Sequence, residues 1–171
     1  MAKKTTKATT TSAATAGSVT LTGFPPLVGK NPTTLILGEF PGEESLLIGE
    51  YYANPCNRLR DIIADKYGLP KPISYSDFKK CLDVHQIALW DVYATKTVAG
   101  GKESYTKNNV KAFLATHQIQ KVIFNGREAE KVFKRMKISP LPKDLCYAPS
   151  TSSAYAMPYQ NKLAAWQQVL P

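Results

Sequence analysis

The sequence predicts an α/β fold, a three-layer α/β/α sandwich around a central four-stranded, mostly parallel sheet. Short apolar runs that are typical of buried strands alternate along the chain with longer segments whose apolar residues recur at helical spacing. Glycine ends two of these runs, at Gly38 and Gly126. Strands that are joined through helices pair in parallel and bury both faces, so this alternation predicts helical layers on either side of one sheet.

Four segments are predicted as strands. Residues 34–38 and 87–92 are nearly continuous apolar runs, which indicates burial on both faces. Residues 121–126 form the third strand, and residues 145–148 form a short fourth strand. In a parallel sheet of this kind, the ligand crevice lies beyond the carboxyl ends of the strands.

Five segments are predicted as helices, because their apolar residues lie three or four positions apart. In the first of them Leu59, Ile62 and Ile63 follow this spacing, and Asn57 is a plausible N-cap. The five segments are residues 57–67, 77–84, 109–116, 127–136 and 161–170.

The 171 residues are enough for one ordinary domain. Residues 1–18 are almost all Lys, Thr, Ala and Ser, which predicts a disordered basic tail ahead of one domain over residues 19–171. The formal net charge is +9, which suits a polyanionic partner such as nucleic acid, although part of it lies in the tail. The domain is expected to act as a monomer.

The three cysteines, Cys56, Cys81 and Cys146, show neither a CxxC pair nor the spacing of a zinc site. Their odd number and wide spacing indicate reduced thiols and argue against a four-cysteine iron–sulfur cluster. No metal and no organic cofactor is implied. No apolar run is long enough to span a membrane, and no secretory signal is present, so a cytoplasmic protein is expected, associated with the nucleoid if the source is bacterial.

Polar residues follow the predicted strands at the edge where a ligand would bind. Glu39 follows the first strand, Asp91 lies in the second, and Asn125 ends the third. A loop of small polar residues, 149–153, follows the fourth strand. The topology alone therefore predicts that these residues surround the opening of one ligand crevice.

Residues 38–46 and 51–57 contain the runs Gly-Glu-Phe-Pro-Gly-Glu-Glu-Ser-Leu and Tyr-Tyr-Ala-Asn-Pro-Cys-Asn. Three later segments, residues 87–92, 122–126 and 149–154, follow at fixed order and spacing. Together these motifs resemble those of the hypoxanthine-DNA glycosylases, a branch of the uracil-DNA glycosylase superfamily. The resemblance covers residues 24–170 and implies the fold of that superfamily and a monofunctional DNA glycosylase acting on DNA with a deaminated or modified base.

Breaking an N-glycosidic bond needs an acceptor that positions water near the sugar and donors directed at the leaving base. The resemblance implies that Asn57 holds the water, since Phe40 stands where many relatives have an acidic residue or Asn. The alternative is that Asn57 only caps the helix. Glu39 is the second candidate for activating water, and its alternative is a surface charge.

A glycosylase rotates the target nucleotide out of the duplex and into a pocket. That pocket needs a wall that packs against the base and a group that hydrogen-bonds to its polar edge. Phe40 is predicted as a wall of the pocket and Tyr52 as the stacking platform, although Tyr52 could equally belong to the core. Asp91 stands where uracil-specific relatives place a base-reading Asn, and an ionised Asp accepts hydrogen bonds only, which favours a base edge that carries an N–H group. Asn125 offers both a donor and an acceptor, or it merely forms the turn with Gly126.

The late loop is predicted to contact DNA phosphates through hydroxyl and backbone N–H groups. Its residues are Pro149, Ser150, Thr151, Ser152 and Ser153. An ordinary Ser/Thr loop is the alternative.

Hypoxanthine is the first predicted substrate. Where the family has a large aromatic pair after Asn57, this chain has Leu59 and Arg60, which could enlarge or recharge the site. This motivates two alternatives, uracil or a modified cytosine of the phage type, the latter with a role in antiphage defence. A rival of another class is a non-catalytic nucleic-acid-binding module with the same fold.

Overall fold

A computed structural model describes residues 17–171 of the chain. The predicted tail lies outside the described residues except for Gly17 and Ser18, and Ser18 already begins a strand. The strands are β1 (Ser18–Thr22), β2 (Thr34–Gly38), β3 (Ile87–Asp91), β4 (Tyr93–Ala99), β5 (Lys102–Lys107), β6 (Lys121–Asn125) and β7 (Asp144–Ala148). The helices are α1 (Glu43–Ile48), α2 (Leu59–Tyr67), α3 (Tyr75–Val84), α4 (Val110–Thr116), α5 (Arg127–Arg135) and α6 (Tyr159–Val169).

The central sheet has the strand order β3-β2-β6-β7, and every neighbouring pair is parallel. The predicted four-stranded sheet is confirmed, with strand ends within one residue of the expected ones. Gly38 lies beside Asp91 in the register of β2 and β3, and Asn125 lies beside Ala148 in that of β6 and β7. The carboxyl ends of all four strands therefore meet at one edge of the sheet.

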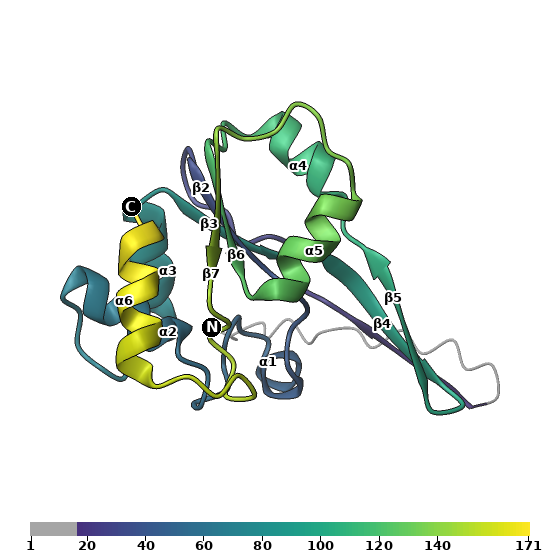
Figure 1. The fold of residues 1–171 in the computed structure, drawn as a ribbon. Helices are drawn as coiled ribbons and strands as arrows, with labels where there is room; N and C mark the ends of the chain where they lie inside the picture. Colours follow the sequence, from purple (N-terminus) through teal and green to yellow (C-terminus); the bar gives the residue numbers. More distant parts are fainter. Residues whose placement is uncertain (1–16) are drawn as a thin grey trace, which may run out of the picture.

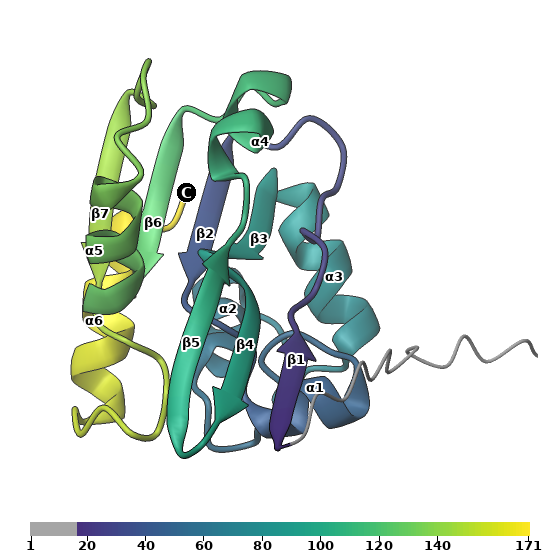
Figure 2. The same ribbon diagram turned by 90° about the vertical axis from the view of Figure 1, so that its right-hand side faces the viewer.

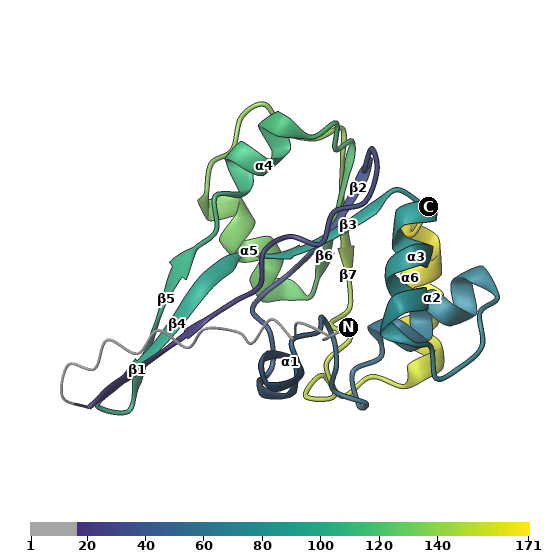
Figure 3. The same ribbon diagram turned by 180° about the vertical axis from the view of Figure 1, so that it is seen from behind.

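Helices cover both faces of this sheet, as the three-layer prediction requires (Figure 1). Ile36 packs into a core with α2, α3 and α6 that includes Trp166. Its neighbours Leu35 and Leu37 pack into a second core with α4 and α5 that includes Phe133. This alternation follows from the pleat of a strand, which directs successive side chains to opposite faces. Figure 3 shows the same layers from behind.

A second sheet of three antiparallel strands, in the order β1-β4-β5, was not predicted. We call these three strands the arm, because they extend away from the body of the molecule (Figure 1), and Figure 2 shows them side by side. Gly100 and Gly101 join β4 to β5 with φ angles of 55° and 73°. Two successive positive φ angles are the requirement of the tight hairpin turn that matches strand twist, and glycine meets it without strain.

The five predicted helices are all present, with ends that differ by no more than two residues from those expected. The short helix α1 was not predicted, and it follows Gly42 in the loop between β2 and α2. No helix within residues 17–171 is both long and apolar enough to cross a membrane.

Candidate active site

A cavity of about 240 Å³ lies at the carboxyl edge of the central sheet. This volume is below the range of drug-sized ligand pockets and suits one nucleobase. Five separate segments of the chain line it, which is why its residues are far apart in sequence. The lining residues are Gly38, Glu39, Phe40, Pro41, Gly42, Ser45, Tyr51, Tyr52, Asn54, Asn57, Asp91, Asn125, Ser150, Thr151, Ser152 and Ser153.

The floor of the cavity depends on a glycine at the end of β2. A Cβ atom on Gly38 would lie 2.4 Å from Asp91 Oδ1 and 2.9 Å from the Tyr52 hydroxyl oxygen. Contacts this short are sterically forbidden, so any side chain at position 38 would displace both groups. The first glycine of the motif is therefore required because Asp91 and Tyr52 approach the backbone so closely.

Asp91 is 4% exposed, and its Oδ2 atom has no hydrogen-bond partner among the residues that the structure describes. Burial, together with the nearby Glu39 carboxylate, raises the pKa of Asp91 to about 7. The Asp91 backbone is held in place by Asn108, whose Nδ2 donates to the carbonyl oxygens of Asp91 and Tyr93 at 2.8 and 3.1 Å. A carboxyl group with a pKa this close to neutrality can act as a hydrogen-bond donor as well as the acceptor that the sequence predicts.

The two adjacent tyrosines have different environments. Tyr51 is 5% exposed, donates its hydroxyl proton to Pro25 O at 3.0 Å, and packs edge-on against Phe24, so it belongs to the core. Tyr52 has a positive φ of 55°, which turns it toward the cavity, where its hydroxyl accepts a hydrogen bond from Asn125 Nδ2 at 3.3 Å. Burial and the neighbouring Asp91 raise the pKa of Tyr52, so its hydroxyl stays protonated.

Phe40 is half-buried and lies between the cavity and the arm. Its ring meets that of Tyr105 on β5 edge to face, with 6.3 Å between centroids. Tyr105 in turn packs on Tyr93 of β4 with 4.5 Å between centroids. Through these contacts the arm supports one wall of the cavity.

Asn57 lines the cavity from the loop just before α2. The helix begins at Leu59, and its N-cap residue is Arg58 rather than the predicted Asn57. Asn57 Oδ1 nevertheless accepts the backbone N–H of Leu59 at 3.0 Å. An amide oxygen has two lone pairs, so one remains for a water molecule. The capping contact and the predicted catalytic role are therefore compatible, since the cap fixes the amide at the cavity wall.

Glu39 is an exposed residue that also lines the cavity. Partial desolvation and the carboxylate of Glu128 raise its pKa, while Lys96 opposes this effect. Its backbone oxygen accepts the N–H of Tyr93 at 3.1 Å, which joins the end of β2 to the start of β4. A carboxylate whose pKa is raised is a better proton acceptor than an ordinary surface glutamate.

The side-chain amide of Asn125 connects the end of β6 to the late loop. Its Oδ1 accepts the N–H of Thr151 at 2.9 Å, and its Nδ2 donates to Thr151 Oγ1 at 2.9 Å as well as to Tyr52. Both amide protons are thus engaged within the protein, and one acceptor lone pair remains free. Gly126 follows with a φ of 97°, so the turn that was the alternative explanation is also present.

The five predicted DNA-contacting residues of the late loop fall into two groups. Pro149 and Thr151 are buried, and Pro149 O accepts Trp166 Nε1 at 2.9 Å. Ser150, Ser152 and Ser153 are partly or fully exposed and line the cavity, which Pro149 does not. The buried pair fixes the loop, while the three serines remain available to a ligand outside.

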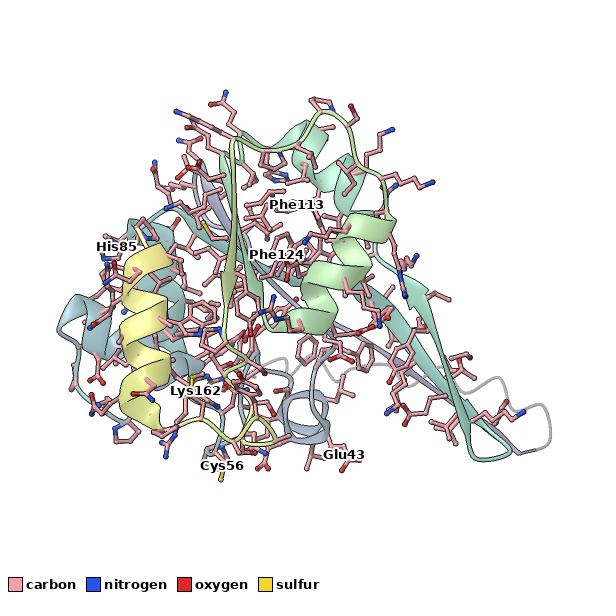
Figure 4. The ribbon with its side chains drawn as sticks, in the orientation of Figure 1. Glu43, Cys56, His85, Phe113, Phe124 and Lys162 are labelled. Atoms are coloured by element: carbon pink, nitrogen blue, oxygen red, sulfur yellow. The ribbon has the colours of Figure 1, made fainter. Side chains whose placement is uncertain are left out.

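Sequence reasoning missed Lys162, which is only 3% exposed on α6 (Figure 4). Its Nζ donates to Ser152 O at 2.8 Å, and burial lowers its pKa. Lys162 precedes the buried Trp166 by four residues, and this spacing places both on one helix face. That spacing is the signal that could have identified an inward-facing lysine.

The interpretation of Leu59 and Arg60 as residues that enlarge or recharge the site is wrong. Leu59 is fully buried in the core, and neither residue lines the cavity. Arg60 pairs with Glu50 at 3.0 Å and donates to the Tyr51 carbonyl oxygen. Their side chains support the loop from behind instead of facing a ligand.

Within residues 17–171, no group of three or more His, Cys, Asp or Glu side chains is placed to hold a metal ion. Cys56 is exposed, Cys81 is buried and Cys146 is half-buried, and all three are free thiols. The polar groups of the cavity are carboxyl, amide and hydroxyl groups, which can bind water and a polar ring.

Comparison with known proteins gives consistent matches. A sequence model described as the Uracil DNA glycosylase superfamily matches residues 25–170. A hypoxanthine DNA glycosylase of Methanosarcina acetivorans is 27% identical over 157 residues, which cover 86% of this chain and 96% of that protein. A hypoxanthine DNA glycosylase of Methanosarcina barkeri is 28% identical over 113 residues, covering 63% of this chain and 72% of that protein.

A solved structure is also similar. It is a solution NMR structure of a Methanosarcina acetivorans protein proposed to be a uracil DNA glycosylase. The TM-score is 0.71 at 26% sequence identity, and the match covers 89% of this chain and 97% of that one.

Proposed function

The chain belongs to the uracil DNA glycosylase superfamily and is a DNA glycosylase; from this premise we propose that it removes hypoxanthine from DNA by hydrolysis. The observation that carries the proposal is that Asn57, Asp91, Tyr52 and Phe40 meet at one cavity of nucleobase size beside the serines of the late loop. Two relatives named hypoxanthine DNA glycosylases support the choice of base.

In the proposed reaction, Asn57 holds the water that attacks the sugar carbon. Its Oδ1 keeps one free lone pair and is fixed by the N–H of Leu59, so it can orient a water molecule at little entropic cost. Glu39, at the same cavity, accepts the proton that the water releases. The bond between the sugar and the base breaks, and the base leaves with the bonding electron pair.

The base itself is held by Tyr52 and Phe40, which offer a stacking platform and a wall, while Asp91 contacts its polar edge. Among the described residues no lysine lines the cavity, and the buried Lys162 is committed to Ser152 O. A glycosylase without an amine nucleophile releases the base by water alone. This supports a monofunctional enzyme that leaves an abasic site.

A substrate panel tests the proposal directly. Labelled duplexes that carry one hypoxanthine, uracil or modified cytosine are incubated with the protein, and abasic sites are then cleaved with alkali. We expect the hypoxanthine duplex to be cleaved fastest. If the protein cleaves a duplex with another base and leaves the hypoxanthine duplex intact, the substrate assignment is contradicted. If that other base is a modified cytosine of the phage type, a role in defence is favoured.

The catalytic assignment is tested with Asn57→Ala. We expect the single-turnover rate on hypoxanthine to fall by about 100-fold, because loss of one group that acts in the transition state typically costs this much. The exposed Asn161 on α6 provides the matched control, and Asn161→Ala should keep the full rate. Glu39→Gln is compared in the same way with the exposed Glu44→Gln. Full activity of both the Asn57 and Glu39 variants would refute the assignment.

A further inference from the structure

Asp91 is the one buried carboxyl group that lines the cavity, within residues 17–171. Its Oδ2 atom is inaccessible to solvent and lacks a hydrogen-bond donor, although nearly all buried polar atoms in proteins have one. The close approach of Asp91 Oδ1 to Gly38 shows that the carboxyl group fits tightly into its site. An unsatisfied buried group next to a ligand cavity indicates that the ligand completes its hydrogen bonding.

The surroundings of Asp91 disfavour a negative charge. The titratable groups that act on it are Glu39 beyond β2 and Tyr51 and Tyr52 on the loop after α1. None of the three is a cation, and no described lysine, arginine or histidine lines the cavity. The Tyr51 hydroxyl donates to Pro25 O, and both amide protons of Asn125 go to Thr151 and Tyr52, so these donors are not available to a carboxylate.

The chemistry of the proposed reaction also disfavours a carboxylate at this position. The departing base carries the electron pair of the broken bond, so negative charge grows on its ring and exocyclic oxygen. An ionised Asp91 would repel that charge, whereas an O–H donor would stabilise it. A carboxylic acid that is kept neutral by a dry site is an established way to provide such a donor.

We propose that Asp91 binds the flipped base as a neutral carboxylic acid, donating its O–H to the exocyclic oxygen while its carbonyl oxygen accepts the adjacent ring N–H. This inference rests on the proposed function. Hypoxanthine presents N1–H beside O6, and uracil presents N3–H beside O4, so both edges fit. The proton stays on Asp91 throughout, and the base anion takes its proton from solvent after release. Asp91 is thus a base-binding residue that also stabilises the leaving group.

The first test does not depend on any substrate. The ¹³C resonance of the Asp91 carboxyl group is followed from pH 4 to pH 9 in the free protein and assigned by its loss in Asp91→Asn. We expect it to titrate near neutral pH. In Glu39→Gln the Asp91 midpoint should move to lower pH, because a neighbouring negative charge is removed. A midpoint below pH 5 in the unaltered protein would overturn the proposal.

The second test is the pH profile of single-turnover cleavage. Above about pH 7 the rate of the unaltered enzyme should fall by about tenfold per pH unit, because only the neutral acid stabilises the leaving base. Asp91→Asn supplies an N–H donor and a carbonyl acceptor at every pH, so it should retain activity within about tenfold and lose the alkaline decline. Asp91→Ala has neither group and should be slower by about 100-fold. Asp144→Asn serves as the control and should match the unaltered profile.

Two outcomes of the pH profile would overturn the proposal. One is an unchanged or rising rate between pH 7 and pH 9, and the other is an Asn variant as inactive as the Ala variant. Failure of the proposed function has a different signature. In that case no duplex with hypoxanthine or uracil is cleaved at any pH, while the carboxyl titration of the free protein still reports the protonation state of Asp91.

Discussion

At the scale of single residues, the carboxyl group of Asp91 makes folding stability depend on pH. Its pKa in the folded chain is about 7, whereas an aspartate in an unfolded chain titrates near 3.8. Between these values the folded protein holds a proton that the unfolded chain has lost. The contribution of Asp91 to the free energy of unfolding is therefore fully present below about pH 4. It is lost at about 1.4 kcal/mol per pH unit as the pH rises from there through the folded pKa of about 7.

Asp91→Asn should consequently raise the melting temperature at pH 8 and change it little at pH 4. The amide is neutral at both values and nearly the same size as the acid, so it avoids the cost of a buried charge, on the order of a few kcal/mol at pH 8. Differential scanning calorimetry of the two proteins at both pH values measures the effect. The control Asp144→Asn should shift neither melting temperature, and an equal gain at pH 4 and pH 8 would show that charge is not the cause.

The residues around the cavity could be named from the sequence, because the carboxyl ends of parallel strands meet at one edge. Strand order alone predicts that Glu39, Asp91 and Asn125 lie there, and the resemblance to the family adds Asn57. The raised pKa of Asp91 could not be predicted in this way. It results from burial of the carboxyl group and from the nearby Glu39 carboxylate, and this burial exists only in the folded chain.

At the scale of elements, the late loop is held by three parts of the fold. Asn125 of β6 binds Thr151, the backbone N–H of Arg58 donates to Thr151 O at 2.9 Å, and Lys162 of α6 donates to Ser152 O. Trp166 adds a hydrogen bond to Pro149 O. The backbone of the loop is therefore ordered before DNA arrives, which lowers the entropic cost of binding.

Lys162→Met should weaken duplex binding by about tenfold and leave the cleavage rate of bound DNA within about twofold. Methionine keeps the length of the side chain but cannot donate to Ser152 O, and an unsatisfied carbonyl group costs about 1–3 kcal/mol. Fluorescence anisotropy and single-turnover kinetics measure the two quantities separately. The exposed Lys111 on α4 gives the control variant Lys111→Met. A loss confined to the chemical step would contradict the positioning role.

The strands of the central sheet were predictable and those of the arm were not. A buried strand is a continuous apolar run, but β4 is only half-buried and β5 is mostly exposed, and both mix Thr and Lys with Tyr. The one available signal was Gly100-Gly101, a pair typical of tight hairpins. The arm matters for the site, because Tyr105 on β5 contacts Phe40.

At the scale of the whole molecule, the net charge of +9 favours a polyanion, and three lysines of that total lie within residues 1–16. A chain that starts at residue 17 should therefore bind duplex DNA with a weaker salt dependence. If all three lysines contact phosphates, the slope of log affinity against log salt should fall in magnitude by about 3. Anisotropy titrations between low and moderate salt measure this slope, and identical slopes would show that these lysines make no phosphate contacts.

The hydrogen bonds of Asn125 also have an evolutionary consequence. Its amide joins Thr151 and Tyr52 at once, so a change at Asn125 leaves both partners unmatched, and a change at Tyr52 or Thr151 leaves a group of the Asn125 amide unmatched. Stable descendants of this sequence are therefore expected to change the three positions together or to keep all of them. Correlated substitution among positions 52, 125 and 151 is the pattern that this geometry predicts across relatives.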